Sequence, residues 1–320
     1  MLLVPAGAAV NQGTRAGACS SSFEVVFVTD AELLRSSIND DGWRGVSDAL
    51  RDQPCGHARL IISPRPSEYR RNLQLAADYQ PDLVIAASFL LRDAVLEAAA
   101  ANPRVQFVLV DPLVSTPGSS NLAVLSFRED ETAFLAGALA ALVTKTGVVA
   151  GVYGPEGEPD RAHRHAFERG AAQIRQDLTV LGAYQPAAEP SPYTNPAWGS
   201  GQARAFIAQG ADVIFGTGGS TGQGALRAAA EAGKGCIGAE PADASVSSCL
   251  LATASTAIDL AVASAVREAA AGRWSGGIHS LGLAEGMVRL TTRPSVPTEV
   301  VQRLAAIRQQ LVNRTLSTGI

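Results

Sequence analysis

The feature that most constrains the fold of this sequence is a regular alternation of two kinds of segment. Short runs of β-branched and other apolar residues end in Asp, Ser or Gly, and each precedes a longer stretch in which Ala and Leu recur at helical spacing. Such alternation predicts right-handed βαβ units and mainly parallel sheets, hence an α/β fold. The predicted strands are Glu24–Thr29, Ala58–Ser63, Asp82–Ala87, Val105–Val110, Val148–Tyr153, Thr179–Tyr184, Asp212–Gly216, Cys236–Ala239 and Leu250–Thr253. The predicted helices are Asn39–Asp52, Ser67–Tyr79, Leu90–Ala101, Glu129–Thr144, Ala162–Gln176, Pro196–Gln209, Gly222–Ala232, Ala257–Ala271 and Thr298–Asn313.

The alternation breaks at Asn121–Phe127, where a strand follows the preceding strand with only a loop containing Pro, Gly and Ser between them. A β–β junction inside a parallel α/β chain indicates a crossing from one sheet to another. We expect a second crossing near Thr253–Thr256 and a third in Ser275–Met287, before the last strand. Three crossings predict two Rossmann-like lobes joined by a hinge, and 320 residues suit two domains of ~150 residues. The expected lobes are 23–125 plus 254–277 and 126–253 plus 278–320, preceded by a signal-like segment 1–22.

Composition excludes several classes of protein. Hydrophobic residues make up 47% of the chain and charged residues 18%, which favours packed cores over disorder. The net charge is −4 and there is no block of Lys and Arg, so nucleic acid is not an expected partner. No apolar run approaches the ~20 residues that a membrane-spanning helix needs.

The first residues resemble an export signal. An apolar run, Leu2–Val10, precedes Ala16-Gly17-Ala18-Cys19, which resembles a lipoprotein cleavage box. The basic region that normally opens such a signal is missing before Leu2, and a true start upstream of Met1 would supply it. We expect lipidation at Cys19 and an extracytoplasmic protein attached to the cell membrane only through that lipid. The alternative is a tail in which the cysteine occurs by chance.

The other cysteines are Cys55, Cys236 and Cys249, and none belongs to a CxxC pair, so no metal site is expected. Cys236 and Cys249 lie near the starts of two successive strands. They could form a disulfide in an oxidising compartment, but two small buried thiols are the favoured interpretation.

A Gly-rich turn, Gly216–Gly224, follows a strand and opens a helix, and Glu240 ends the next strand. This arrangement partly matches a dinucleotide-binding fingerprint. However, Thr221 stands where the third glycine belongs, and such fingerprints usually open the first βαβ unit. We therefore expect no cofactor.

No set of residues indicates catalysis. His163 and His165 are two positions apart and so face different sides of a helix; we expect both to be solvated. Ligands of open α/β sheets bind beyond the carboxyl ends of the strands. The side chains expected there are acceptor-rich, and no nucleophile or histidine base accompanies them, so binding is favoured over an enzyme's chemistry. These residues are Asp30, Ser88, Asp111, Gly218 and Glu240.

Several segments together resemble the basic membrane protein family of substrate-binding lipoproteins, the purine nucleoside receptor group. They occur in order over most of Phe23–Leu290: Val28–Asp30, Ile38–Val46, Asp82–Val95, Asn102–Asp111, Asn121–Gly147, Gln209–Glu240 and Leu281–Leu290. The resemblance implies a type I periplasmic-binding-protein fold. It also implies a lipid-anchored protein that hands nucleosides to the permease of an ABC importer. A ligand-sensing regulator with the same fold and no transport role is the alternative.

The resemblance also implies a binding site, in which the base lies against aromatic rings and strand-end carboxylates hold the ribose. Tyr193 stands where the family tends to have Phe, and Glu240 where Asp is usual. The full set of implied ligand-binding residues is Asp30, Asn39, Ser88, Phe89, Asp111, Tyr193, Gly218, Gly219 and Glu240.

Three positions depart from the family pattern. Arg35 replaces an acidic residue, Ile38 a stacking Phe, and Thr256 a common Lys. A guanidinium and a missing ring would change the preferred ligand, so the resemblance leaves ligand identity open. Trp43 shares a helix face with Asn39, and we expect it to pack in the core or hinge rather than against the ligand.

Overall fold

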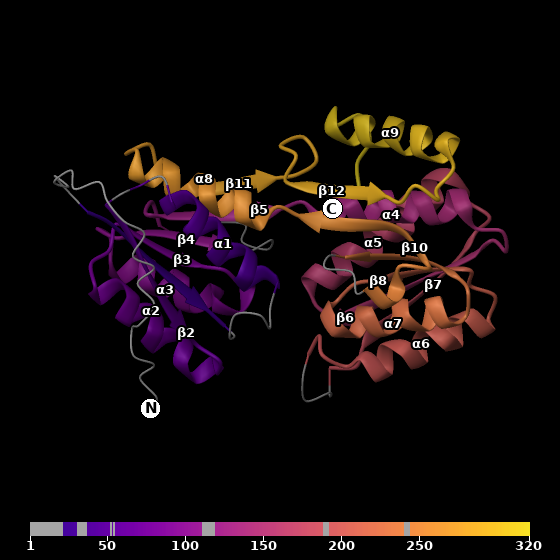
Figure 1. The fold of residues 1–320 in the computed structure, drawn as a ribbon, viewed down its shortest axis with the longest axis horizontal. Coiled ribbons are helices and arrows are strands. Elements are labelled where there is room, and N and C mark those ends of the chain that lie inside the picture. The colour runs from indigo at the N-terminus through magenta and orange to yellow at the C-terminus, as the bar shows by residue number, and fades with distance from the viewer. Residues whose placement is uncertain are drawn as a thin grey trace.

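The computed structural model describes residues 22–30, 37–51, 53, 55–110, 119–187, 192–239 and 244–320. The chain forms two α/β lobes, each built on a six-stranded sheet (Figure 1). The predicted fold class is therefore confirmed: the sheets are mainly parallel, and the chain passes from one to the other three times. Within the described ranges, no helix has both the length and the apolar character needed to cross a membrane.

The first sheet has the strand order β11-β5-β4-β3-β1-β2, and all its neighbouring strands are parallel. Its central strands are apolar on both faces because helices cover both sides, which is why Val25 to Val28 form one continuous apolar run. The strands are β1 (Phe23–Thr29), β2 (Gly56–Ile62), β3 (Leu83–Ala86), β4 (Gln106–Val110), β5 (Leu122–Phe127) and β11 (Gly277–Leu281). The helices of this lobe are α1 (Ser37–Arg51), η1 (Pro66–Glu68), α2 (Tyr69–Asp78), η2 (Phe89–Leu91), α3 (Arg92–Ala101) and α8 (Ile258–Ala270).

The second sheet has the order β12-β10-β9-β8-β6-β7, in which only β12 is antiparallel to its neighbour, β10. The strands are β6 (Val148–Pro155), β7 (Thr179–Gln185), β8 (Val213–Gly216), β9 (Gly235–Ala239), β10 (Leu250–Thr256) and β12 (Val288–Thr292). The helices are α4 (Glu129–Val143), α5 (Glu158–Ile174), α6 (Pro196–Ala208), α7 (Gly219–Glu231), η3 (Ala244–Val246) and α9 (Thr298–Val312).

Helices α4 and α5 pack with their backbones in contact. A Cβ atom added at Gly137 would lie 1.9 Å from the carbonyl oxygen of Phe167, and one added at Gly170 would lie 1.9 Å from that of Phe134. Only glycine fits at either position. The two helices therefore meet without side chains between them at both points.

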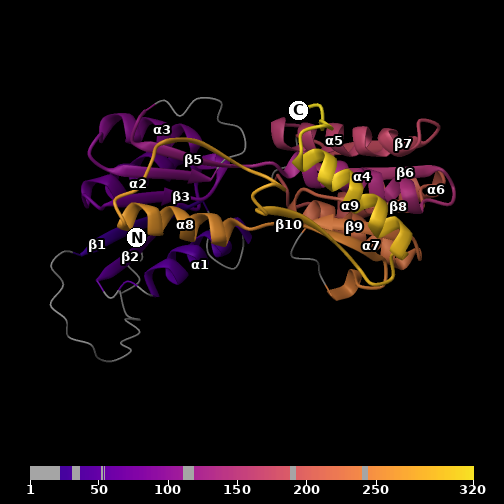
Figure 2. The same ribbon diagram turned by 90° about the horizontal axis from the view of Figure 1, so that it is seen from above.

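The three crossings lie side by side between the lobes (Figure 2). The first leads from β5 into α4, the second from β10 into α8, and the third from β11 into β12. Their backbones are bonded together: Arg128 N–H donates to Leu281 O at 2.9 Å, and Ala257 N–H donates to Met287 O at 2.8 Å. A further bond, from Leu283 N–H to the Glu131 carboxylate at 2.7 Å, ties the third crossing to α4.

Two apolar residues of α1 pack against the hydrophobic core. Trp43 lies against the core, with its ring centroid 5.8 Å from that of Phe27, in agreement with the packing role expected for it. Ile38 also packs against this core. A Cβ added at Gly42 would lie 2.6 Å from the Phe27 ring, so helix α1 approaches strand β1 closely there.

Helix α5 begins at Glu158, four residues before the predicted start at Ala162. Its first turn carries Pro159, whose missing N–H is no loss at that position, and the acidic side chains of Glu158 and Asp160, which the helix N-terminus stabilises. The earlier start places Asp160 and His163 one turn apart on the same helix.

Candidate functional site

In the first lobe, three of the predicted site residues form one hydrogen-bonded cluster. Asp30 follows β1, Ser88 follows the neighbouring strand β3, and Asn39 lies in the first turn of α1. The Ser88 hydroxyl donates to Asp30 Oδ2 at 2.7 Å, and Asn39 Nδ2 donates to Asp30 Oδ1 at 2.8 Å. Ser88 Oγ also accepts from Leu90 N–H at 3.1 Å, which caps η2. The cluster thus fixes the carboxyl ends of two adjacent strands.

The cluster retains acceptors that the described residues leave unused. Each oxygen of Asp30 receives one of the two bonds above, whereas a carboxylate offers about four acceptor positions. Asn39 is fully buried, and its Oδ1 has no partner in the described part of the chain. An acceptor-rich site of this kind suits a ligand that presents hydroxyl or amine donors.

In the second lobe, a polar network holds the loop before α6. Tyr193 has a left-handed backbone, with φ of 65°, which is unusual for a bulky side chain. Its N–H donates to Gln185 Oε1 at 3.2 Å, and that same oxygen accepts from the Thr221 hydroxyl at 2.6 Å. Thr221 Oγ1 in turn accepts from Asn195 N–H at 3.0 Å, and the Asn195 side chain caps α6.

The ring of Tyr193 rests on the end of β6. A Cβ at Gly154 would lie 2.4 Å from Tyr193 Cε1, so the ring lies directly against the glycine backbone. The phenol donates to Asp160 Oδ2 at 3.1 Å, and Asp160 Oδ1 accepts from Gly154 N–H at 2.8 Å. Burial raises the pKa of Asp160, against the opposing effects of His163 and of its two hydrogen bonds. Burial and the neighbouring Asp160 also raise the pKa of Tyr193.

Gly218, which precedes α7, and Gly219, the first residue of α7, pack beside this ring. Their φ angles are 85° and 63°, in the left-handed region that favours glycine. A Cβ at Gly218 would lie 2.3 Å from Gly154 N, and one at Gly219 would lie 2.8 Å from Tyr193 O. The Gly-Gly turn therefore supports the loop that carries Tyr193.

The two lobes meet through one aromatic pair of the predicted site. The centroids of Phe89, in η2 of the first lobe, and Tyr193 are 6.3 Å apart, and the ring planes make an angle of 76°. This edge-to-face contact is a favoured geometry for two rings. It brings the Asp30 cluster and the Tyr193 loop to opposite sides of one interlobe region.

A second polar cluster lies where the crossings enter the second lobe. Glu129, the first residue of α4, accepts from the Thr256 hydroxyl at 2.8 Å. Its other oxygen is 3.3 Å from His163 Nε2, and the His163 side chain is only 16% exposed. Burial lowers the pKa of His163, but Glu129 has the opposite effect, and the net shift is upward. Burial likewise raises the pKa of Glu129, but His163 and Thr256 outweigh it, and the net shift is downward.

The prediction that His163 is solvated is therefore wrong, because α5 packs this side chain against the start of α4. His165, on the other side of the helix, is exposed as predicted. Thr256, which departs from the resembled family's pattern, is the partner of Glu129. The remaining predicted residues Asp111, Glu240, Cys19 and Arg35 lie outside the described residues.

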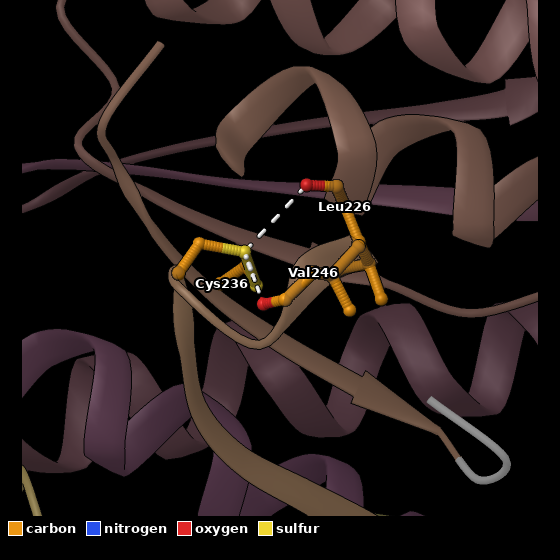
Figure 3. The surroundings of a disulfide bond; sticks show 4 residues. Leu226, Cys236 and Val246 are labelled. Atoms are coloured by element: carbon orange, nitrogen blue, oxygen red, sulfur yellow. Dashed lines mark hydrogen bonds between the residues drawn. A yellow bond between two sulfur atoms is a disulfide. The ribbon is translucent and has the colours of Figure 1, made fainter. Parts of the chain in front are cut away.

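Cys236 and Cys249 form a disulfide, with their Cα atoms 5.2 Å apart (Figure 3). The favoured interpretation of two free thiols is therefore wrong, because the parallel pairing of β9 with β10 brings the two residues together. Cys249 Sγ lies 3.2 Å from Val246 O and 3.6 Å from Leu226 O. A disulfide sulfur has no hydrogen to donate, so these are packing contacts. The bond closes the segment that connects β9 to β10.

Sequence reasoning missed four residues that support the site: Asp160, Gln185, Thr221 and Gly154. Gln185 ends β7, one residue beyond the predicted end of that strand at Tyr184, whereas Gly154 and Thr221 carried no such signal. Asp160 had a signal of another kind, since Pro159 and two neighbouring acidic residues are typical of a helix start. That signal would have placed Asp160 in the first turn of α5, close to the end of β6.

Comparison with known proteins agrees with this architecture. The model of the family described as ABC transporter substrate-binding protein, PnrA-like, matches residues 23–319. Basic membrane protein A1 of Borrelia garinii subsp. bavariensis is 25% identical over 306 residues, which are 92% of this chain and 87% of that protein. The ABC transporter nucleoside-binding protein BmpA of Lactococcus lactis subsp. cremoris is 26% identical over 213 residues, 65% of this chain and 58% of that protein. A solved ABC transporter solute-binding protein from Aeropyrum pernix K1 superposes with a TM-score of 0.77 over 92% of both chains at 20% identity, which shows the shared fold.

Proposed function

This chain belongs to the PnrA-like family of ABC transporter substrate-binding proteins, and from that premise we propose that it captures a nucleoside-like ligand between its lobes and delivers it to the permease of an ABC importer. The observation that carries the proposal is the opposition of the Asp30 cluster in one lobe to Tyr193 in the other, across the Phe89 contact. One side offers acceptors for hydroxyl groups, and the other offers an aromatic surface for a base.

The chemistry of the two sides supports a ligand of mixed character. A hydrogen bond to a carboxylate contributes about 1.5–3 kcal/mol, and stacking of a base on an aromatic ring about 1–3 kcal/mol. Asp111 and Glu240 would add two carboxylates at the ends of their strands. Gly218 and Gly219 would act by supporting the Tyr193 loop. We assign the protein a binding role and no catalytic role, because these groups recognise a ligand without a nucleophile among them.

Capture would proceed by closure of the lobes about the three crossings, a hinge motion that occurs on the μs–ms timescale in such folds. For this motion we keep the lobe limits at 23–125 plus 254–277 and 126–253 plus 278–320. The bonds between the crossings, from Arg128 N–H to Leu281 O and from Ala257 N–H to Met287 O, would make the three segments bend together.

We place the protein outside the cytoplasm, attached to the membrane by a lipid on Cys19. The disulfide between Cys236 and Cys249 supports this location, because such bonds persist in oxidising compartments and are rare in the cytosol.

The test is a thermal-shift screen followed by calorimetry. The panel contains purine and pyrimidine nucleosides, free bases, ribose and amino acids. A ligand bound only to the native state stabilises it by about 2.7 kcal/mol at a hundredfold excess over its dissociation constant. We expect nucleosides to raise the melting temperature, and bases or ribose alone to raise it less.

Glu299→Gln removes an exposed carboxylate from the first turn of α9 and is the matched control for substitution of the site carboxylate Asp30. It should bind like the parent. Stabilisation by amino acids or sugars with none by any nucleoside would overturn the proposed ligand class.

A further inference from the structure

We propose that Asp160 is a positioning residue, which fixes the Tyr193 ring in the orientation that the ligand requires without touching the ligand itself. The inference rests on the proposed function, in which an aromatic ligand group lies against Tyr193. It adds a residue that neither the strand ends nor the family pattern indicates.

The first observation is the geometry of the buried carboxylate. Asp160 is only 2% exposed, so each of its oxygens needs a donor. One oxygen accepts from Gly154 N–H at 2.8 Å and the other from the Tyr193 hydroxyl at 3.1 Å. The bond from Gly154 N–H fixes the carboxylate relative to β6, and the bond from the Tyr193 hydroxyl fixes the ring relative to the carboxylate.

The second observation is that the backbone of Tyr193 is strained. A left-handed conformation at a bulky residue costs about 1–3 kcal/mol and persists only where the surroundings enforce it. Here the Tyr193 N–H donates to Gln185 Oε1 at 3.2 Å. The backbone of Gly219 packs so close to the Tyr193 carbonyl oxygen that a Cβ added at Gly219 would lie only 2.8 Å from it. Strain retained in this way is typical of residues placed for function.

The third observation is that the ring is held at several edges. Gly154 lies against Cε1 and Cδ1, Asp160 holds the hydroxyl, and Phe89 contacts the ring across the lobes. The side chain nonetheless stays partly exposed. An aromatic group that is pinned but still accessible is a preorganised binding surface.

This arrangement limits what Tyr193 offers a ligand. Its phenol proton is donated to Asp160, so the hydroxyl is not available as a donor for the ligand. The affinity that Tyr193 contributes should therefore depend on where the ring lies. Removing either partner of the Asp160–Tyr193 bond should release the same restraint.

The experiment is a double-mutant cycle of Tyr193→Phe and Asp160→Asn, with calorimetry on adenosine, guanosine, inosine and uridine. We expect each single variant to weaken binding of the tightest nucleoside by about five- to tenfold. The double variant should lose no more than either single one. Asp160→Asn should therefore have no further effect on affinity once Tyr193→Phe is present. Losses that multiply in the double variant would overturn the proposal.

Melting temperatures and dissociation constants together distinguish a positioning role of Asp160 from a merely structural one. In such a role, Asp160→Asn would lower the melting temperature equally in the parent and in the Tyr193→Phe variant, and would leave the dissociation constant unchanged. That outcome contradicts positioning. Asp177→Asn, an exposed carboxylate after α5, is the matched control and should keep the parent's affinity.

A readout without ligand keeps the two proposals distinguishable. In protein labelled with ¹³Cζ-tyrosine, Tyr193→Phe identifies the Tyr193 signal. Asp160→Asn should shift that signal and lower the pH at which the phenol ionises, whereas Asp177→Asn should do neither. An unchanged signal overturns the positioning role even if nucleosides bind. Failure of every nucleoside to bind overturns the proposed ligand, while the shifted signal would still establish that Asp160 holds the ring.

Discussion

The carboxylate of Glu129 lies 3.3 Å from Nε2 of His163, at the point where the first crossing enters the second lobe. Thr256, the last residue of β10, from which the second crossing begins, donates to the same carboxylate at 2.8 Å. One polar cluster thus joins two hinge segments to α5. Because the pKa of His163 is raised and that of Glu129 is lowered, the cluster makes stability depend on pH.

The sign follows from the two directions. Charged His163 stabilises the fold fully below its ordinary pKa of 6.5, and this contribution is lost as the pH rises through the folded value. Charged Glu129 stabilises the fold fully above its ordinary pKa of 4.5, and this contribution is lost as the pH falls through the folded value. Both contributions are complete between pH 4.5 and 6.5.

We therefore expect urea unfolding to show that His163→Gln loses more free energy of unfolding, relative to the parent, at pH 6 than at pH 9. The acidic groups that face His163 are Glu129, Asp160 and Asp130, and all of them remain in this variant. His165→Gln, on the exposed side of the same helix, is the control. A difference between parent and His163→Gln that stays constant across this range would contradict the prediction.

Tyr153→Phe should stabilise the protein. The Tyr153 side chain is fully buried, and its hydroxyl finds no hydrogen-bond partner among the residues that the structure describes. Removing an unsatisfied buried hydroxyl while keeping the ring should raise the free energy of unfolding by about 1 kcal/mol. Tyr184→Phe, whose ring centroid is 5.6 Å away, provides the comparison and should change stability by less than about 0.5 kcal/mol. A destabilised Tyr153→Phe would show that the hydroxyl has a partner.

Loss of the disulfide should destabilise the second lobe. The bond links residues 13 positions apart, and closing a loop of this size contributes about 3 kcal/mol, largely by restricting the unfolded chain. Cys236→Ala, Cys249→Ala and the double variant should lose similar amounts in urea unfolding, because all three lack the same bond. Losses that add in the double variant would mean that the bond is not formed in solution.

Asp30→Asn should weaken nucleoside binding by about tenfold to a hundredfold, because the amide removes the negative charge and replaces one acceptor oxygen with a donor. Ser88→Ala should have a smaller effect, since it keeps the Asp30 carboxylate and removes the bond of 2.7 Å that orients it, together with the cap that Ser88 Oγ provides to η2. Calorimetry with the nucleoside selected by the screen measures both. Equal affinity of Asp30→Asn and the parent would remove Asp30 from the site.

Cys19→Ala should release the protein from the membrane. If a lipid on Cys19 is the anchor, the parent should appear in the membrane fraction of its native cells and in the detergent phase of a Triton X-114 partition. The variant should then appear in the aqueous phase. Parent protein found in the cytosol with Met1 intact would exclude the anchor.

The fold could be predicted because continuous apolar runs indicate strands that are covered on both faces, and apolar residues at helical spacing indicate helices that pack on them. Strand β11 (Gly277–Leu281) is absent from the predicted set for the same reason. It lies at the edge of its sheet, where β5 is its one partner among the described strands, and it contains His279 and Ser280 in place of an apolar run. Its strand conformation depends on the partner rather than on its own sequence.

The site could be predicted only where topology alone fixes neighbours. Asp30 and Ser88 follow adjacent parallel strands, so their proximity follows from strand order. The Glu129–His163 contact joins two helices whose mutual packing no local pattern encodes. Asp160 was missed because its role depends on where α5 begins and on a loop residue, Tyr193, that lies 33 positions away in sequence.

The glycine contacts between α4 and α5 have a mechanical consequence. Helices separated by side chains can slide past one another as rotamers change, but backbones in contact at Gly137 and Gly170 leave no such compliance. Helix α4 begins at the first crossing with Glu129, and the first turn of α5 carries Asp160, which accepts from the Tyr193 hydroxyl. We therefore expect the two helices to move as one rigid body, so that a rotation at the first crossing would also move the Tyr193 ring.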